Sequence, residues 1–383
     1  DKMRSRVLTH MLKRDVYIRI FTIIAIAVIV GIAMSVNTSI ADAKKIEYLG
    51  PYTAQQIGVN RYLAELDQVT EHTHDVTLKS ISPNQIDQYV QDNADVLDGI
   101  RVWDWQAAFA KLKPEIGLIP YVNFEDNDIL RFDDKLYWTA SMAPILPTSV
   151  SLENQWYNEH LVYTHVPEGF LTLEATSGQI VDSSELFEQR QIYYGEGGLL
   201  DETWSGYPTD RGSTTAELNN ASYDGIGGLE ISPPISWLFE PNFMISYPGT
   251  PIHVMRYKDV NERMETLYPY FLYDLFGKEL DSLPVTDGKN TYWLVPLIIG
   301  FDSRDVPWSA GNPYLRLVGY GLVDTYDGSI QLIKHGDDFF TNMFMAHYSD
   351  KVIDMPAWLE EQVRYPQEPV SYTHLTLPTI LRV

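Results

Sequence analysis

The sequence predicts an α+β protein in which one transmembrane helix is followed by a large, strand-rich mixed ectodomain with short helices. Three observations lead to this expectation. A basic N-terminal stretch runs into an uncharged apolar segment, and the rest of the chain is acidic. From about residue 132, short β-branched and aromatic runs alternate with Gly, Pro, Asn and Asp, which is typical of strands and turns.

The apolar segment predicts a transmembrane helix over residues 20–40, which carry no charge. At about 1.5 Å per residue such a helix is roughly 31 Å long, close to a hydrocarbon core of about 30 Å. The alternative is a secretory signal peptide, because the strongest apolar run, 20–33, has a suitable length and Ala41-Asp42-Ala43 offers a small-x-small cleavage site. The long basic segment before the run favours the spanning helix.

The distribution of positive charge predicts the orientation of the helix. Residues 1–19 hold six Lys and Arg residues, whereas only Lys44 and Lys45 closely follow the apolar run. Because positive charge is retained on the cytoplasmic side, we expect a cytoplasmic basic segment at 1–19 and an extracytoplasmic domain at 41–370. The expected location is therefore the cell membrane, with the lipid bilayer as one partner and the residues after about 41 extracellular.

The composition of the outer part limits its function. Residues 1–36 contain six of the 28 basic and two of the 52 acidic residues, which leaves 22 basic and 50 acidic residues and a net charge of −28. Such a charge repels nucleic acid, so no nucleic-acid partner is expected. The absence of Cys excludes disulfides, catalytic thiols and thiolate metal sites. The domain must rely on its core, and 25 Tyr, 14 Phe and 9 Trp supply the apolar area for one large lobe or two intimate ones.

The order of elements follows from periodicity and turn residues. Helices are expected at 44–70, at 84–94 with Asn84 near its N-cap, and at 104–112, followed by 259–267 and 355–362. A hairpin is expected from 315–326 and 329–334, with Asp327-Gly328 as a two-residue type I′ turn. The Gly-rich stretch 195–228 is expected to be a long loop region. The other strand candidates are 137–142, 169–173, 192–194, 252–257 and 292–299.

Three polar clusters are candidates for a site, and each has a simpler interpretation. His72-Thr73-His74-Asp75 offers metal ligands but reads more simply as a solvated loop. The Glu125-Asp126-Asn127-Asp128 run offers oxygen ligands as calcium loops do, yet it lacks the Gly and the distal Glu of an EF-hand. His160 and His165 would point to opposite faces of a strand. We therefore assign no metal site, no cofactor and no catalytic residue from the sequence.

A set of short segments carries a family resemblance: 100–105, 158–165, 192–196, 287–293, 323–328, 355–356 and 364–366. Together they resemble uncharacterised protein family 0182, large multi-pass membrane proteins of bacteria and archaea. The resemblance implies several spanning helices in a full-length member, of which residues 20–40 would be the last, followed by the extracytoplasmic domain; this weakens the signal-peptide alternative. The family brings no agreed reaction. Its His-Gly-Tyr-Gly run is His165-Val-Pro-Glu here, and residues 371–383 look like a non-native, adaptor-derived tail.

The aromatic residues of these segments are expected to anchor the core: Trp103, Trp105, Tyr193, Tyr194, Tyr292 and Trp293. Asp104, between two Trp residues, is either a helix cap or a perturbed acid, and the cap is favoured. The expected function is an integral membrane protein of unknown activity whose acidic ectodomain has a non-catalytic envelope binding or scaffold role, with an envelope polymer, a lipid or a protein as partner. The alternative is a carboxylate-dependent hydrolase or transferase acting on envelope glycans or lipids, and a dedicated transporter is a third, weaker alternative.

Overall fold

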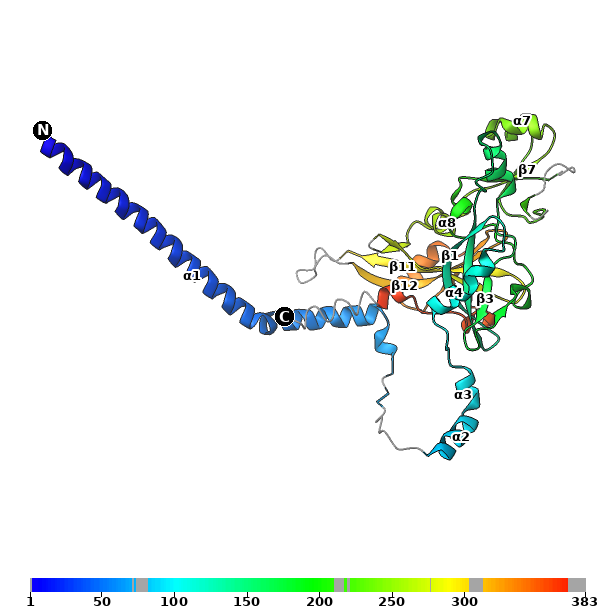
Figure 1. Ribbon diagram of the computed structural model, residues 1–383, viewed down its shortest axis with the longest axis horizontal. Coiled ribbons are helices and arrows are strands. Elements are labelled where there is room, and N and C mark those ends of the chain that lie inside the picture. Colours follow the sequence, from blue (N-terminus) through cyan, green and yellow to red (C-terminus); the bar gives the residue numbers. More distant parts are fainter. Residues whose placement is uncertain are drawn as a thin grey trace.

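The computed structural model describes residues 2–70, 72–73, 82–209, 217–218, 221–275, 277–302 and 313–370. It confirms the mixed class, with one long N-terminal helix followed by a strand-rich domain (Figure 1). The helices are α1 (Lys2–Leu63), α2 (Pro83–Asp92), α3 (Ala94–Asp98), α4 (Trp105–Ile116), α5 (Gln155–Tyr157), α6 (Ile235–Phe239), α7 (Asn242–Ser246), α8 (Val260–Leu267), α9 (Phe339–His347) and α10 (Ala357–Glu360). Shorter helical turns are η1 (Leu66–Gln68), η2 (Leu152–Asn154), η3 (Asn158–Val162), η4 (Ser183–Glu185) and η5 (Gly198–Asp201).

The strands form four sheets. The first has the order β1 (Val122–Phe132), β2 (Lys135–Pro144), β3 (Leu171–Glu174) and β4 (Ile180–Val181). The second has the order β10 (Leu283–Thr286), β11 (Thr291–Phe301), β12 (Tyr314–Asp324), β13 (Ile330–Lys334) and β14 (Val352–Ile353). A small sheet joins β5 (Ser205–Pro208), β7 (Ile252–Met255) and β6 (Leu229–Ile231), and β8 (Asp274–Leu275) pairs with β9 (Lys278–Glu279).

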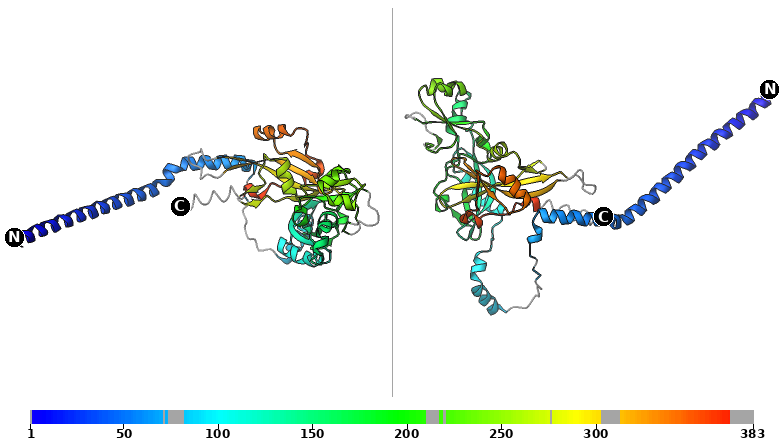
Figure 2. Two further views of the ribbon diagram at one scale, coloured as in Figure 1. Left: turned by 90° about the horizontal axis from the view of Figure 1, so that it is seen from above. Right: turned by 180° about the vertical axis from the view of Figure 1, so that it is seen from behind.

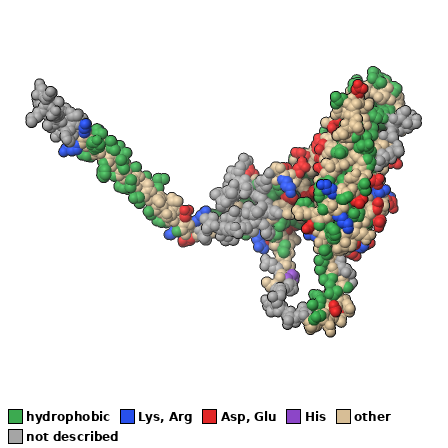
Figure 3. Space-filling model, in the orientation of Figure 1, with side chains coloured by type: hydrophobic (Ala, Val, Ile, Leu, Met, Phe, Trp, Pro, Cys, Tyr) green, Lys and Arg blue, Asp and Glu red, His purple; other side chains and the backbone are tan. Residues whose placement is uncertain are grey.

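Helix α1 is long and apolar enough over residues 13–45 to cross a membrane, by length and composition, and its most apolar window is not buried against the rest of the chain. Hydrophobic side chains cover this part of the rod, well away from the domain (Figure 3). The helix bends before its last turns, and Pro51 lies inside it (Figure 1). A proline removes one backbone hydrogen bond of the helix, which accounts for a bend there.

A network of charged side chains, largely shielded from solvent, attaches the end of α1 to the domain. The Arg316 guanidinium on β12 donates to Asp338 Oδ2 at 2.7 Å, lies 2.8 Å from Glu65 Oε1, and donates to the Leu63 carbonyl at 3.2 Å. His335 Nε2 lies 2.7 Å from Glu65 Oε2. The last turn of α1 is thus held by side chains from β12 and from the segment that follows β13, so the anchor helix has a defined attachment to the domain. The ribbon views from above and behind show the end of α1 next to the domain (Figure 2).

The second sheet lies in the centre of the core because both of its faces are covered. Along β11, Trp293 and Val295 belong to a cluster that also contains Leu112 of α4. Leu294 and Ile298 point the other way, into a cluster with Leu359 of α10. A strand that is buried on both faces reads as a continuous apolar run, and 293–299 is such a run.

The expected hairpin is present, but its turn differs from the prediction. Strands β12 and β13 pair antiparallel with Val323 opposite Ile330, so the connection is longer than two residues. Gly328 has φ +65°, whereas Asp327 is not among the residues with positive φ. The Asp324 carboxylate accepts from the backbone N–H groups of Tyr326 and Asp327 at 2.8 Å each, which stabilises the wider turn. This side-chain bond competes with a two-residue turn, and spacing alone does not reveal it.

A two-residue turn of the I′ kind occurs elsewhere, between β1 and β2. Asp133 and Asp134 both have positive φ, of 51° and 60°, and the flanking Phe132 and Lys135 are paired. Asp and Asn are the residues besides Gly that tolerate this conformation. The sequence predicted that strands and turns begin at about Phe132, but it did not identify this turn.

Replacement of Gly328 by Val is expected to destabilise the domain by about 1–3 kcal/mol. The β-branched residue is strained at positive φ, and a Cβ at this position would overlap the Tyr194 ring. Urea unfolding followed by Trp fluorescence measures the change. Gly249→Val is the matched control, because a Cβ at Gly249 meets nothing within 4 Å and its φ is ordinary. Equal stability of the two variants would contradict the role of Gly328.

Several local expectations need correction. His160 lies in the helical turn η3, not on a strand, so the opposite-face argument for His160 and His165 was wrong. Ile192 makes a single bridge to Val166 and the segment 192–194 is not a strand. The N-cap of α2 is Ser82, whose backbone N–H donates to Gln85 Oε1 at 2.9 Å, and Asn84 lies inside the first turn. The other strand candidates correspond to β2, β3, β7 and β11, and the stretch 195–228 also contains η5 and β5.

The aromatic anchors were predicted in part. Tyr193, Tyr194 and Trp293 are fully buried, as expected. Trp103 and Tyr292 are half-buried. The prediction for Trp105 was wrong, because its side chain is 55% exposed in the first turn of α4. Asp104 is the N-cap of this helix, accepting from the Ala107 N–H at 2.8 Å, which confirms the cap.

Candidate functional site: an acidic pocket

The most distinctive hollow in the described part of the chain is a pocket of about 640 Å³ lined by carboxylates. Four segments distant in sequence surround it: β1, the loop that leads into η5, the start of α8, and the β8–β9 hairpin with the residues after it. Among the described residues of its lining, Lys278 is the one cation and none is aromatic. The lining residues are Glu125, Asp126, Glu196, Gly197, Asp201, Asp259, Asn261, Glu262, Lys278, Glu279, Leu280 and Asp281.

A bulge in β1 gives the pocket two of its acids. The pairing of β1 with β2 shifts register between Phe124 and Asn127, which leaves Glu125 and Asp126 outside the regular ladder. The Asp126 backbone is still held, because its N–H donates to Ser141 Oγ at 3.0 Å and its carbonyl accepts from the same hydroxyl at 3.3 Å. Two residues on, Asp128 returns to the ladder opposite Thr139.

The opposite wall of the pocket depends on a glycine. Gly197 has φ +68°, and a Cβ on it would overlap the Glu125 carboxylate. The preceding Gly195 is pinned to the start of α8, since its N–H donates to the Lys258 carbonyl at 3.0 Å and its carbonyl accepts from the Val260 N–H at 2.9 Å. Asp259 is the N-cap of α8, accepting from the Glu262 N–H at 2.8 Å. The close approach of backbone to carboxylate at Gly197 brings Glu196 and Asp259 to the same pocket.

Asp128 is the deepest acid of the group. Its side chain is 5% exposed, and among the described residues its Oδ2 atom has no hydrogen-bond partner. One carboxylate oxygen each of Asp126, Asp128 and Asp281 lies within 4.8 Å of the others, with Asp126 and Asp281 exposed at the rim. Burial, reinforced by the charges of Asp281 and Asp126 and opposed by Arg364, raises the pKa of Asp128 well above its ordinary value.

The surrounding carboxyls are perturbed in the same direction. Enclosure by the pocket walls, followed by the charge of Asp126, raises the pKa of Asp281 to about 6. Burial and the charges of Asp128 and Asp126 raise the pKa of Glu196 well above its ordinary value, and burial with the charge of Asp126 raises that of Glu125. Each shift has the same physical reason: carboxylates that are withdrawn from water and close to one another resist ionisation.

A second carboxyl pair lies on the α8 side of the pocket. The carboxyls of Asp201 of η5 and Asp259 lie within hydrogen-bonding reach of each other, so the charge of one affects the ionisation of the other. Burial raises the pKa of Asp259 to about 6 even though the Glu262 N–H favours its ionised form. Burial also raises the pKa of Asp201. Such a pair can exchange a proton near neutral pH, which is a property of acid–base sites and of cation sites alike.

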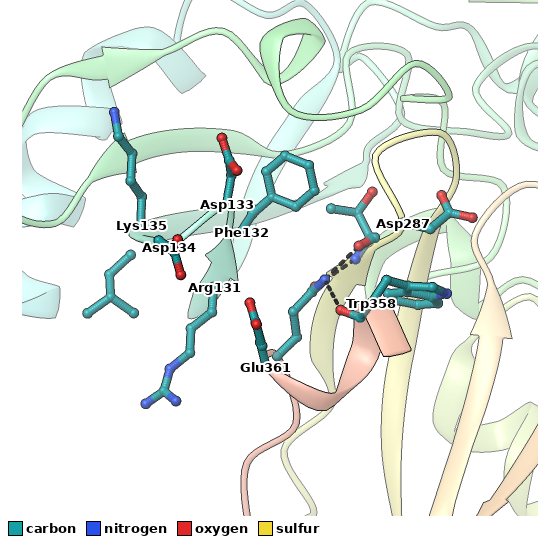
Figure 4. A pocket seen from close by; sticks show the side chains of 11 residues that line it. Arg131, Phe132, Asp133, Asp134, Lys135, Asp287, Trp358 and Glu361 are labelled. Atoms are coloured by element: carbon teal, nitrogen blue, oxygen red, sulfur yellow. Dashed lines mark hydrogen bonds between the residues drawn. The ribbon is translucent and has the colours of Figure 1, made fainter. Parts of the chain in front are cut away.

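A second, more open hollow of about 750 Å³ lies beside the β1–β2 turn (Figure 4). Several of its polar groups already take part in structural bonds. Gln362 donates to the Thr286 carbonyl at 2.7 Å and to the Trp358 carbonyl at 3.1 Å. Lys135 pairs with Glu174 at 3.0 Å, and Asp287 accepts from the Asn290 N–H at 2.6 Å. The acidic pocket has an unsatisfied buried carboxylate, that of Asp128, beside its lining residues Asp126 and Asp281, and is therefore the stronger candidate.

The structure separates the sequence candidates. Of the His72–Asp75 cluster, His74 and Asp75 lie outside the described residues, as does the predicted tail at 371–383. His160 stacks on Trp204 with ring centroids 4.0 Å apart, and its Nδ1 lies 2.8 Å from the Trp204 carbonyl. His165 is fully buried, with Nδ1 3.6 Å from Glu217 Oε2. Neither histidine lies in the lining of the acidic pocket.

The run Glu125–Asp128 is the sequence candidate that the fold brings into a site. Sequence reasoning found Asp126 and Asp128 but missed Asp281, which lies more than 150 positions further along the chain. It also gave no role to Asp201 and Asp259, whereas Glu196 was noticed only as the end of a family segment. No rule of sequence spacing links the four segments that form the pocket. The one local signal in the sequence is Gly197 next to Glu196, because glycine permits a close approach of the backbone to another group.

Comparison with known proteins gives a family but no activity. The model of an uncharacterised protein family, UPF0182, matches residues 5–371. A UPF0182 protein of Moorella thermoacetica is 24% identical over 366 residues, covering 84% of this chain and 38% of the relative. Those of Bradyrhizobium diazoefficiens and Solibacter usitatus are 23% and 25% identical, covering 85% and 90% of this chain and 37% and 41% of the relatives.

No solved structure matches this chain. The chain spans about two fifths of the length of the curated relatives that it matches. The family match extends over nearly the whole chain, from the basic N-terminal segment through both large sheets. The chain therefore belongs to the uncharacterised protein family UPF0182.

Proposed function

We propose that this chain is a membrane-anchored protein whose residues after about 41 lie outside the cytoplasm and have a non-catalytic binding or scaffold role at the cell envelope. The observation that carries the proposal is the free apolar part of α1, which projects from the domain with none of its most apolar window buried. A helix of this length and composition is stable in lipid but exposes a large apolar surface in water.

Two further features support an anchored domain. The basic residues precede the apolar segment, which favours a cytoplasmic N-terminal side. The network of Arg316, Glu65 and Asp338 attaches the end of α1 to the domain, so the domain is held close to the membrane surface by its own anchor. An envelope polymer, a lipid or a protein is the proposed partner class.

The acidic pocket supports binding over glycan chemistry. Sites for sugars commonly combine carboxylates with aromatic platforms, and no described residue of this lining is aromatic. The hydrogen-bonded pair of Asp201 and Asp259 is the observation that favours the alternative, a carboxylate-dependent hydrolase or transferase acting on envelope glycans or lipids. Loss of a lipid- or glycan-hydrolysing activity in Asp259→Asn would favour that alternative.

A cysteine placed at Ser222 tests the topology, because this residue is exposed in the described part of the domain and the chain has no native thiol. Intact cells that express Ser222→Cys are expected to react with a membrane-impermeant maleimide. Ser5→Cys, in the basic segment, should react only after lysis. If Ser222→Cys also required lysis, the domain would lie in the cytoplasm and the proposal would be wrong.

A further inference from the structure

We propose that Asp126, Asp128 and Asp281 form a calcium site beside the acidic pocket. This inference rests on the proposed binding role and names its ligand. Asp126 lies in the β1 bulge, Asp128 follows it in β1, and Asp281 lies in the segment between β9 and β10. No run of neighbouring residues contains all three ligands.

The distances suit a calcium ion. Calcium binds oxygen at about 2.4 Å, so two oxygens on one ion stand at most about 4.8 Å apart. One oxygen of each aspartate already lies within 4.8 Å of the other two. This spacing is compatible with ligation of one ion by all three carboxylates, and the pocket that Asp126 and Asp281 line leaves room for water to complete the six to eight ligands that calcium takes.

The buried oxygen of Asp128 shows that the cluster is more than an exposed acidic surface. Desolvating a carboxylate without a hydrogen bond or a counter-ion is costly. Asp128 is only 5% exposed, and its Oδ2 has no hydrogen-bond partner among the described residues. A cation bound to Oδ2 supplies the missing interaction.

The charges around the cluster leave a negative excess. Glu196 and Glu125 add two carboxyls beside Asp126 and Asp128. The opposing cations are Arg364, which donates to the Ile129 carbonyl at 2.8 Å, and Lys278 at the pocket wall. A divalent ion balances this excess, and an all-oxygen ligand set favours hard ions such as calcium over zinc or copper.

The backbone holds the ligands in place. The Ser141 hydroxyl bonds both the N–H and the carbonyl of Asp126, and the Thr139 hydroxyl donates to the Asp128 carbonyl at 3.2 Å. On the other side, Leu280 and Ser282 are buried on either side of Asp281. A bound ion would connect β1 of the first sheet to the segment entering β10 of the second, so binding is expected to raise the stability of the whole domain.

The test uses the full chain in non-ionic detergent micelles, stripped of metal with EDTA and dialysed. Calorimetric titration with CaCl₂ is expected to show one ion per chain with a Kd on the order of 10⁻⁴ M, as in extracellular calcium modules. One millimolar CaCl₂ should raise Tm by about 2–4 °C. Magnesium is expected to bind at least about tenfold more weakly, since it demands shorter and more regular coordination.

Two variants decide the outcome. Asp128→Asn removes the buried charge while keeping the size of the side chain, and it should abolish both the heat of binding and the Tm shift. Asp133→Asn makes the same substitution at an aspartate in the exposed β1–β2 turn and should bind calcium as the unchanged chain does. Equal binding by Asp128→Asn, or no saturable binding by the unchanged chain, would overturn the site, and magnesium binding as tight as that of calcium would overturn the choice of ion.

These results are separable from the topology of the chain. If the chain binds calcium but Ser222→Cys reacts only after lysis, the calcium site is supported and the extracytoplasmic role is refuted. If Ser222→Cys is labelled on intact cells but the chain does not bind calcium, the extracytoplasmic location is supported and the calcium site is refuted.

Discussion

Raising the pH from 4.5 to 6.5 in the presence of EDTA is expected to lower the free energy of unfolding of this protein by about 2 kcal/mol or more. The carboxyls of the acidic pocket cause the loss. Burial raises the pKa of Asp259 to about 6 in the folded chain, against an ordinary value of 3.8. The folded state therefore holds a proton that the unfolded state has already released over this range of pH.

The sign follows from proton linkage. A carboxyl whose folded pKa is raised contributes stability that is fully present below its unfolded pKa and is lost as the pH rises through its folded pKa. For Asp259 the loss between pH 4.5 and 6.5 is about 2 kcal/mol, at about 1.4 kcal/mol for each pKa unit. Asp281, Asp128 and Glu196 act in the same direction, with the contribution of Asp281 reduced by its exposure at the rim.

The range of pH is chosen to isolate these groups. Burial lowers the pKa of Lys258 to about 7, so this residue stabilises the fold with rising pH mainly above 6.5. Below 4.5, carboxyls with depressed pKa values, such as Asp338, begin to dominate. Urea unfolding at pH 4.5, 5.5 and 6.5, followed by Trp fluorescence in non-ionic micelles, gives the free energies.

Asp259→Asn is the informative variant, because Asn also caps helices well and the start of α8 is kept. Its free energy of unfolding should fall by about 2 kcal/mol less than that of the unchanged chain over the same pH range. Asp104→Asn changes another helix N-cap, at α4, and should keep the full pH dependence. A rise of stability between pH 4.5 and 6.5 would show that the pocket acids are ionised in the folded protein.

Replacement of Arg316 by Met is expected to destabilise the domain by about 3 kcal/mol. The Arg316 side chain is 7% exposed and lies between Glu65 and Asp338, whose side chains are 13% and 19% exposed. Removing the cation leaves two acids facing each other out of water, and breaking a buried pair in this way costs about 3–5 kcal/mol. The expected loss lies at the lower end of this range because both acids remain partly exposed to solvent.

The pKa values support this expectation. Burial alone would raise the pKa of Glu65, but the hydrogen bond and charge of His335, together with the charge of Arg316, hold it below its ordinary value. Despite its partial burial, hydrogen bonds from Thr341 and Arg316 lower the pKa of Asp338 to about 2. Both acids are thus ionised at neutral pH, and the guanidinium is the charge they share.

Arg61→Met is the matched control. Arg61 pairs with Asp67 at 3.3 Å, but the two side chains are 44% and 55% exposed, and such pairs contribute less than about 1 kcal/mol. Urea unfolding compares the variants, and hydrogen exchange at the amides of 62–66 reports on the attachment of α1. Exchange there should accelerate in Arg316→Met and remain unchanged in Arg61→Met. A loss below about 1 kcal/mol in Arg316→Met would mean that the network does not hold the helix.

The sequence by itself determined the features that depend on neighbouring residues. A run without charge between basic and acidic segments predicts a membrane helix, because the apolar length of a segment is a local property. Asp104 was predicted correctly as a helix cap, and the helix expected at 259–267 has Asp259 at its start, because a cap bonds a backbone N–H two or three residues away. The run 293–299 predicted a strand, and its lack of alternation matches a strand covered on both faces.

The tertiary structure decided whatever depends on residues far apart in the chain. The sequence outside the anchor contains fifty carboxylates, and it does not show which of them form a site. Asp281 comes close to Asp126 and Asp128 only because the β1 bulge and the β8–β9 hairpin meet in the fold. The ion pair of Arg316 with Glu65 joins residues about 250 positions apart in the sequence. Burial creates the perturbed pKa values and the unsatisfied oxygen of Asp128, and burial is a property of the packed fold, since solvent access at one residue is set by distant segments folded over it.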